Sequence, residues 1–155
     1  MIEKTIFFLR MGNSKIHKYS FSLSHQIKDI ELIEQAIDVL GQDWDIDTKS
    51  LFHLNLVLEE LISNTMYYGF SGMEKGRINV DLSFDGTYIQ VKIHDDALAF
   101  DPTVEAEDTS AQTLDERAIG GLGIMLSQRI SEDMIYRYHE SKNKLSFKIS
   151  TKHND

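Results

Sequence analysis

Apolar and polar residues alternate with a period of two in several short segments of this chain of 155 residues. This period is typical of strands that bury one face. The clearest segments are 77–84 and 88–94, which flank Asp85-Gly86, a pair that favours a tight hairpin. β-branched and aromatic residues extend the prediction to a pair of strands near each end of the chain. The six predicted strands are 3–10, 16–23, 77–84, 88–94, 134–140 and 144–151, with outer turns at 11–14 and at Ser141-Lys142-Asn143.

Other segments repeat their apolar residues every three or four positions, which predicts helices with one buried stripe. We expect helices at 26–41, 48–68 and 122–132. Gly41 and Gly69 are expected to end the first two, because glycine readily adopts the conformation that closes a helix. Thr48 or Ser50 is expected to be the N-cap of the second helix.

The resulting order of elements, ββ-α-α-ββ-loop-α-ββ, predicts an α/β fold that forms a single domain over residues 1–155. Strand pairs joined by tight turns imply a mixed, mostly antiparallel sheet, and the helices would cover one of its faces. We therefore expect a two-layer α/β sandwich. The acidic segment 96–119 has no core pattern, and a loop of this length inside a compact domain is often a lid or a binding loop.

Composition narrows the classes of function. The chain has 16 basic and 25 acidic residues, a net charge of −9, and no cysteine. Disulfides, thiolate metal sites and thiol catalysis are excluded. The negative charge disfavours nucleic acid and anionic lipid as partners, and no apolar run is long enough to span a bilayer. We expect neither a secretory leader nor a membrane location. A phosphate ligand would need backbone N–H groups, a helix N-terminus or a bridging cation.

The first candidate site is the pair Glu60 and Asn64, which lie one turn apart on the same face of the second predicted helix. The Asn64 carbonyl oxygen suits Mg²⁺ as one ligand among waters and phosphates. The Glu60 carboxylate could accept a proton from a hydroxyl group. A solvated pair on a helix surface remains the alternative.

Two further candidates flank the acidic loop. Asp95 ends a predicted strand, where its carboxylate could accept a hydrogen bond from an exocyclic amine, or could simply begin a turn. The run Gly120-Gly121-Leu122-Gly123 precedes a helix, where backbone N–H groups and the helix N-terminus could hold phosphates. A hinge of glycines is the alternative. This run matches neither a Walker A loop nor a dinucleotide-binding fingerprint.

The ordered set of motifs resembles the histidine-kinase-type ATPase domain shared with gyrase-like enzymes, the GHKL or Bergerat fold. The most specific segments are Leu-Glu-Glu-Leu-Ile-Ser-Asn at 58–64 and Glu-Arg-Ala-Ile-Gly-Gly-Leu-Gly-Ile at 116–124. Within that superfamily the chain is most similar to the small anti-sigma factor serine/threonine kinases, over residues 18–150.

The resemblance implies a role for each matched position. Glu60 would be the catalytic base, Asn64 the ligand of Mg²⁺ on ATP, Asp95 the acceptor of the adenine amino group, and 103–119 the ATP lid. The cofactor-binding set that it implies is Asn64, Asp95, Ala97, Ala99, Phe100, Gly120, Gly121, Leu122, Gly123 and Ser146.

The resemblance implies a cytoplasmic bacterial kinase that binds Mg-ATP and phosphorylates a serine or threonine of an anti-sigma antagonist protein. A sigma factor would be its second partner, and a homodimer its expected assembly. Relatives usually carry glycines where this chain has Ala97 and Ala99. If position 97 needs a positive φ, alanine would strain the loop by about 1 kcal/mol. Two other interpretations therefore stay open: a partner-binding module of the same fold without useful ATP binding, and the ATP-binding half of a histidine kinase. The lack of a dimerisation helix with a phosphoacceptor histidine disfavours the latter.

Overall fold

The computed structural model describes residues 5–11, 14–104 and 121–152. Along the chain these residues form β1 (Thr5–Met11), β2 (Ser14–Ser24), η1 (Ile27–Ile30), α1 (Glu31–Asp43), α2 (Thr48–Asn64), η2 (Thr65–Gly69), β3 (Arg77–Phe84), β4 (Tyr88–Asp95), α3 (Gly121–Ile130), β5 (Glu132–His139) and β6 (Lys142–Ser150). The predicted lid, 103–119, lies almost wholly outside the described residues. Within the described ranges, no helix is both long and apolar enough to cross a bilayer.

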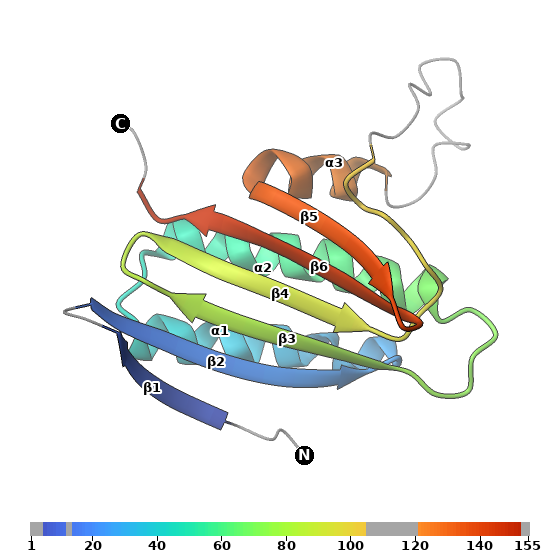
Figure 1. Cartoon of the computed structure of the whole chain (residues 1–155), viewed down its shortest axis with the longest axis horizontal. Coiled ribbons are helices and arrows are strands. Elements are labelled where there is room, and N and C mark those ends of the chain that lie inside the picture. The colour runs from blue at the N-terminus through green and yellow to red at the C-terminus, as the bar shows by residue number, and fades with distance from the viewer. Residues whose placement is uncertain (1–4, 12–13, 105–120, 153–155) are drawn as a thin grey trace.

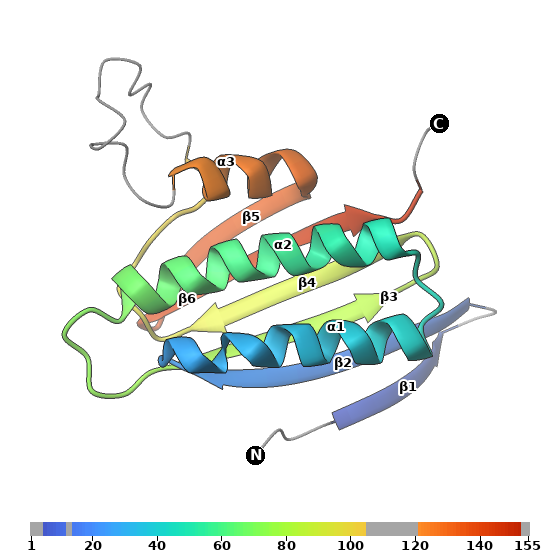
Figure 2. The same cartoon turned by 180° about the vertical axis from the view of Figure 1, so that it is seen from behind.

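The strands form one sheet in the order β1-β2-β3-β4-β6-β5, with all the described pairings antiparallel. The helices cover one face of this sheet, and no described helix covers the other face (Figures 1 and 2). The two-layer α/β sandwich predicted from the sequence is confirmed. The described strands pair only antiparallel, whereas a mixed, mostly antiparallel sheet was expected.

The core lies between the sheet and the helices, and the period-two pattern explains its position. On β3 and β4 every second residue is buried, and these side chains meet the apolar stripe of α2, where Leu54, Leu58 and Ile62 are fully buried. Each such side chain contributes about 1.5–3 kcal/mol on burial. The buried stripe fixes the rotation of α2, and therefore fixes which of its polar side chains face the end of β4.

The boundaries between α1 and α2 differ from the prediction. Gly41 does not end α1, which continues to Asp43, and the chain reverses at Asp45 with φ of 53°. A Cβ at Gly41 would lie 2.9 Å from Leu51 Cδ1, so the glycine permits close packing of the helices. The N-cap of α2 is Asp47, whose carboxylate accepts hydrogen bonds from the Ser50 N–H at 2.9 Å and from the Ser50 hydroxyl at 2.5 Å. The prediction of Thr48 or Ser50 as N-cap was wrong.

The last hairpin also turns earlier than expected. Glu140 and Ser141 both have positive φ, 52° and 56°, and they form the turn between β5 and β6. Two successive residues with positive φ are the mark of a type I′ turn, which normally uses Asn-Gly. With the turn here, Asn143 belongs to β6 rather than to the turn. The earlier turn matters because it makes Asn143 a strand residue whose side chain lines the cavity described below.

The C-terminal end of α2 changes its hydrogen bonding before it stops at Gly69. Residues Thr65–Gly69 form a π-helix, in which the Phe70 N–H donates to the Thr65 carbonyl at 3.2 Å. Single π turns inside or at the end of α-helices are frequent at functional sites. This wider turn brings Gly69 against the loop that follows β4, where the Leu98 N–H donates to the Gly69 carbonyl at 2.9 Å.

Candidate functional site

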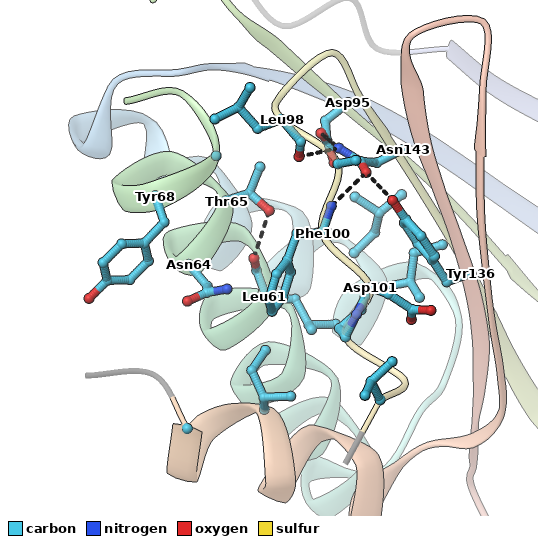
Figure 3. A pocket seen from close by; sticks show the side chains of 18 residues that line it. Leu61, Asn64, Thr65, Tyr68, Asp95, Leu98, Phe100, Asp101, Tyr136 and Asn143 are labelled. Carbon is cyan, nitrogen blue, oxygen red and sulfur yellow. Dashed lines mark hydrogen bonds between the residues drawn. The ribbon is translucent and has the colours of Figure 1, made fainter. Parts of the chain in front are cut away.

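A cavity of about 610 Å³ opens between the C-terminal end of α2, the end of β4, the first turn of α3 and the β5–β6 hairpin (Figure 3). This volume lies within the usual range for sites that hold small molecules and cofactors. The cavity is mainly apolar, with a few polar side chains at its two ends. Its lining residues are Leu61, Asn64, Thr65, Tyr68, Gly69, Ile93, Asp95, Leu98, Ala99, Phe100, Asp101, Pro102, Val104, Gly121, Ile124, Tyr136, Asn143 and Leu145.

Asp95 is the buried acid of this cavity, with 7% of its surface exposed. Its Oδ1 accepts hydrogen bonds from the Ala97 N–H at 3.0 Å and from Asn143 Nδ2 at 2.7 Å. Among the described residues, nothing donates to its Oδ2. Desolvation by burial raises the pKa of Asp95, although the hydrogen bonds from Asn143 and Ala97 oppose that rise. The carboxylate therefore keeps one oxygen able to accept a hydrogen bond from a ligand.

Asn143 lies directly opposite Asp95 in the pairing of β4 with β6. Its side chain also holds the loop that follows Asp95. Its Nδ2 donates to Asp95 Oδ1 and also faces the carbonyl oxygens of Ala97 and Leu98 at 3.3 and 3.1 Å. Its Oδ1 accepts from the Phe100 N–H at 3.2 Å and from the Tyr136 hydroxyl at 2.6 Å. Figure 3 shows the amide between Asp95 and Tyr136. One side chain thus fixes both the acid and the path of the chain from residue 97 to residue 100.

The two alanines that replace family glycines fit this loop without backbone strain. Neither Ala97 nor Ala99 is among the described residues with positive φ. Ala97 is buried, and its methyl group fills the space beside Gly69, where an added Cβ would lie only 2.8 Å from the Ala97 Cβ. Ala99 is exposed and lines the cavity. The strain considered for position 97 is therefore absent.

The end of α2 contributes Asn64 and Thr65 to the opposite wall of the cavity. Asn64 is half-buried, and Thr65 donates from its hydroxyl to the Leu61 carbonyl at 3.1 Å. Within the described ranges no group of three or more His, Cys, Asp or Glu side chains could hold a metal ion. Asn64 offers the cavity an amide carbonyl oxygen, and a Mg²⁺ ion held there would take its other ligands from water and phosphate oxygens.

Glu60 is not among the residues that line the cavity, and its carboxylate lies against Gly123 of α3. A Cβ built on Gly123 would overlap Glu60 Oε2 and would lie 2.6 Å from its Cδ. Gly121 lines the cavity, whereas the Leu122 side chain is 73% exposed and is absent from the lining. Gly120 lies outside the described residues.

α3 also holds the segment that enters the predicted lid. Gln128 Nε2 donates to the Pro102 carbonyl at 2.7 Å and contacts the Val104 carbonyl at 3.4 Å. Asp101 closes the preceding turn by accepting hydrogen bonds from the N–H and the hydroxyl of Thr103. The chain therefore enters the segment after residue 104 from a defined position beside the cavity.

The cavity unites only part of the predicted cofactor set. Asn64, Asp95, Ala99, Phe100 and Gly121 line it together. Ala97 is buried beside Gly69 and does not line the cavity, and Gly123 contacts Glu60. The expectation for Ser146 needs correction, as described next.

Ser146 lies on the face of β6 that is turned away from the helices. The buried residues of β6 are Asn143, Leu145, Phe147 and Ile149, and alternation puts Ser146 on the opposite face of the sheet. The polar side chain of β6 that reaches the cavity is Asn143. The period-two pattern could have identified it, because a polar residue at 143 shares its phase with three core residues.

Comparison with known proteins finds a matching family model and several relatives. A family model described as a histidine kinase-like ATPase domain matches residues 23–149. The chain is similar to the serine-protein kinase RsbW of Listeria innocua serovar 6a, with 28% identity over 91 residues, 56% of this chain and 58% of the relative. RsbW of Listeria monocytogenes serovar 1/2a matches with the same identity and coverage, and RsbW of Listeria monocytogenes serotype 4a is 26% identical over 91 residues, with that coverage too. The chain thus spans less than two thirds of the length of these relatives.

Proposed function

Because the chain belongs to the histidine kinase-like ATPase domain family, we propose that it is an ATP-dependent serine/threonine protein kinase that regulates a sigma factor. Its phosphoacceptor would be an anti-sigma antagonist protein. The proposal is supported by the similarity to proteins named serine-protein kinase RsbW. The observation that carries it is the single cavity on which Asn64, Asp95 and Gly121 converge.

The adenine end of the proposed site is the buried pair Asp95 and Asn143. Asp95 Oδ2 is available to accept a hydrogen bond from an exocyclic amine, while Asn143 holds Oδ1 at 2.7 Å. The apolar walls near them, including Leu98 and Phe100, suit the faces of a purine ring. A buried acceptor also discriminates against a base with a carbonyl oxygen at that position, because two acceptors would then face each other unpaired.

The phosphate end lies between Asn64 and the first turn of α3. Among the described lining residues, none is a lysine or arginine, and the whole chain has a net charge of −9. Phosphate charge must therefore be met by backbone N–H groups at the start of α3, such as that of Gly121, and by a divalent cation. When bound, Mg-ATP supplies the transferable phosphoryl group and a metal ion that neutralises its charge, and Asn64 would hold that ion.

Glu60 is proposed as the catalytic base. It would accept the hydroxyl proton of the substrate serine or threonine as the hydroxyl oxygen bonds to the terminal phosphorus and the bond from that phosphorus to the ADP leaving group breaks. Positioning and charge neutralisation would supply most of the rate enhancement, as in other phosphoryl transfers. Glu60 stands one helical turn before Asn64, so the base and the metal ligand belong to one rigid element.

The remaining proposals concern context. Residues 1–155 are proposed to act as one domain, with 103–119 as its lid, in a cytoplasmic homodimer. A sigma factor and its antagonist are proposed as the two protein partners. These proposals derive from the similarity to RsbW, which covers 56% of this chain.

Titration calorimetry tests nucleotide binding. We expect Mg-ATP to bind the wild-type protein. Asn64→Ala should weaken binding when Mg²⁺ is present, and should have little effect in EDTA, because it removes only the metal ligand. Ser146→Ala, on the face of the sheet turned away from the helices, is the matched control. An undetectable heat at millimolar Mg-ATP, with no competition by ADP, would leave the partner-binding module as the function.

Phosphate transfer from labelled ATP to purified candidate antagonist proteins tests the activity. Glu60→Gln removes the proton acceptor but keeps the size of the side chain, so we expect transfer to fall at least 100-fold with Mg-ATP affinity nearly unchanged. Equal losses of transfer and of affinity would assign Glu60 a structural role.

A further inference from the structure

Gly123 is the third residue of α3 and faces Glu60 across the contact between α2 and α3. A Cβ at position 123 would overlap Glu60 Oε2, and it would lie 2.6 Å from Glu60 Cδ and 3.2 Å from Cγ. A Cβ at Gly121, two residues earlier, would meet nothing within 4 Å. The carboxylate end of Glu60 thus occupies the volume that any other residue at position 123 would fill.

The stability of α3 does not explain why a glycine stands at position 123. Glycine is among the least favourable residues inside a helix, because it loses the most backbone freedom on folding. The fold of α3 itself does not require it, since α3 packs through the buried residues Ile124 and Ser127. Ser127 also donates from its hydroxyl to the Gly123 carbonyl at 2.9 Å, a bond that any residue at 123 could accept.

We propose that Gly123 is a positioning residue for Glu60: by lacking a side chain, it lets the carboxylate lie against the first turn of α3, whose residue Gly121 lines the cavity. The partial positive charge at the start of α3 favours a carboxylate at this place. The proposal rests on the proposed function for the role of Glu60 as base. It differs from a phosphate-binding role for Gly123, because Gly123 acts through Glu60 and not through the nucleotide.

Alanine at position 123 would displace Glu60 without disturbing the nucleotide wall. The atoms in conflict form the far end of a flexible side chain, so Glu60 can rotate away while the helices stay packed. Asn64 and Asp95 are not touched by the change. A displacement of about 1 Å in a catalytic group can cost about 100-fold in rate.

The kinetic test compares Gly123→Ala with the wild type in the phosphate transfer assay. We expect kcat to fall roughly 10- to 100-fold, with the dissociation constant of Mg-ATP within about twofold. Met125→Ala, an exposed change on the same helix, should leave both values unchanged. An equal loss of kcat and of nucleotide affinity would overturn the proposal, because it would place Gly123 in the nucleotide site.

A rescue experiment separates positioning from general damage. Glu60→Asp shortens the side chain by one methylene group, which reduces the overlap and lets the carboxylate turn away from a methyl group at position 123. We expect the added Gly123→Ala change to cost far less in the Glu60→Asp background than in the wild type. A full, additive loss in that background would overturn the proposal.

Thermal unfolding tests the contact itself, without any activity. In a Glu60→Ala background, Gly123→Ala should raise the melting temperature by about 2–4 °C, because helix propensity then acts alone. In the wild-type background the gain should be smaller or reversed. Gly121→Ala is the control, since its effect should be the same in both backgrounds. Equal gains from Gly123→Ala in the two backgrounds would refute the contact, whereas a wild type that transfers no phosphate would refute only the proposed function.

Discussion

Replacing Asn143 by leucine, whose side chain has the same branching and number of heavy atoms, removes the hydrogen-bonding groups that hold Asp95 and the loop after β4. The change deletes a 2.7 Å hydrogen bond to a buried carboxylate. It also leaves the Leu98 carbonyl, the Phe100 N–H and the Tyr136 hydroxyl without their partner. Leucine leaves no cavity at this position, so the expected loss comes from the polar groups that lose their partner.

The magnitude follows from these bonds. A hydrogen bond to a charged group contributes about 1.5–3 kcal/mol, and each neutral one about 0.5–1.5 kcal/mol. Tyr136 is half-buried and can turn its hydroxyl to water, which lowers its share. Burial of the leucine side chain returns about 1 kcal/mol. We therefore expect Asn143→Leu to lower the free energy of unfolding by roughly 3 kcal/mol, a large fraction of a typical total of about 5–15 kcal/mol.

The loss should depend on pH. Burial raises the pKa of Asp95 above its ordinary value of 3.8, while the hydrogen bond from Asn143 favours the ionised form and lowers that pKa. Removing Asn143 therefore raises the folded-state pKa further. The penalty is full above the folded-state pKa and shrinks as the pH falls through it, because protonated Asp95 does not need this donor. The difference between variant and wild type should therefore be full near neutral pH and should shrink on acidification, as the pH falls through the folded-state pKa of Asp95.

Urea unfolding followed by tryptophan fluorescence measures the effect. Trp44 is the single tryptophan, is 6% exposed and lies at the end of α1 remote from Asn143, so it reports global unfolding. A loss of 3 kcal/mol moves the urea midpoint down by about 1–2 M. Ser146→Ala, on the same strand but the other face, should stay within about 0.5 kcal/mol. A loss for Asn143→Leu below about 1 kcal/mol, or one that does not shrink as the pH is lowered, would refute this account of Asp95.

Three other variants test local features by the same unfolding measurement. Ser141→Gly should stabilise the protein by about 0.5–1 kcal/mol, because its φ of 56° is strained for serine but free for glycine; a loss of stability would contradict the turn. Asp47→Ala should cost about 1–2 kcal/mol through loss of the N-cap of α2, and an unchanged midpoint would show that Asp47 does not act as the cap. Gly69→Ala should cost about 1–3 kcal/mol through its conflict with Ala97, and adding Ala97→Gly should recover most of that cost; no recovery would place the conflict elsewhere.

The sequence predicts the fold well where a single period governs a segment. The bounds of β3 agree with the prediction at both ends and those of β4 differ by one residue, because every second residue there is apolar and Asp85-Gly86 separates them. α2 is recovered for the same reason, since a fully apolar stripe leaves one possible face for its polar side chains. That face is why Asn64 could be assigned to a site before its surroundings were known.

The ends of helices and the positions of turns are less predictable, because several neighbouring residues could act as the cap or form the turn with similar free energies. Asp47, Thr48 and Ser50 are all good N-caps, and only the position of α1 decides among them. Glu140 and Ser141 adopt positive φ against their own preference, since the pairing of β5 with β6 fixes the hairpin. No local pattern indicates such a turn.

The site required knowledge of the strand register. Ser146 and Asn143 are three residues apart, and a strand puts such residues on opposite faces. The choice between them depends on where the hairpin turns. The contact between Glu60 and Gly123 was beyond prediction for another reason: it joins two helices across 63 positions of sequence, and only their packing brings the carboxylate to the glycine.

The π turn at Thr65–Gly69 has a consequence for insertions and deletions. A hydrogen bond from Phe70 to Thr65 encloses one residue more than an α-helical turn would. Deleting one residue there would let the α-helical pattern run on, and everything beyond the deletion would rotate by about 100° about the helix axis. Tyr68 and Gly69 would then leave the cavity wall, although the hydrophobic core would keep all its side chains unless Met66 itself were deleted. A homologue shorter by one residue at this point would have to rebuild that wall from different side chains.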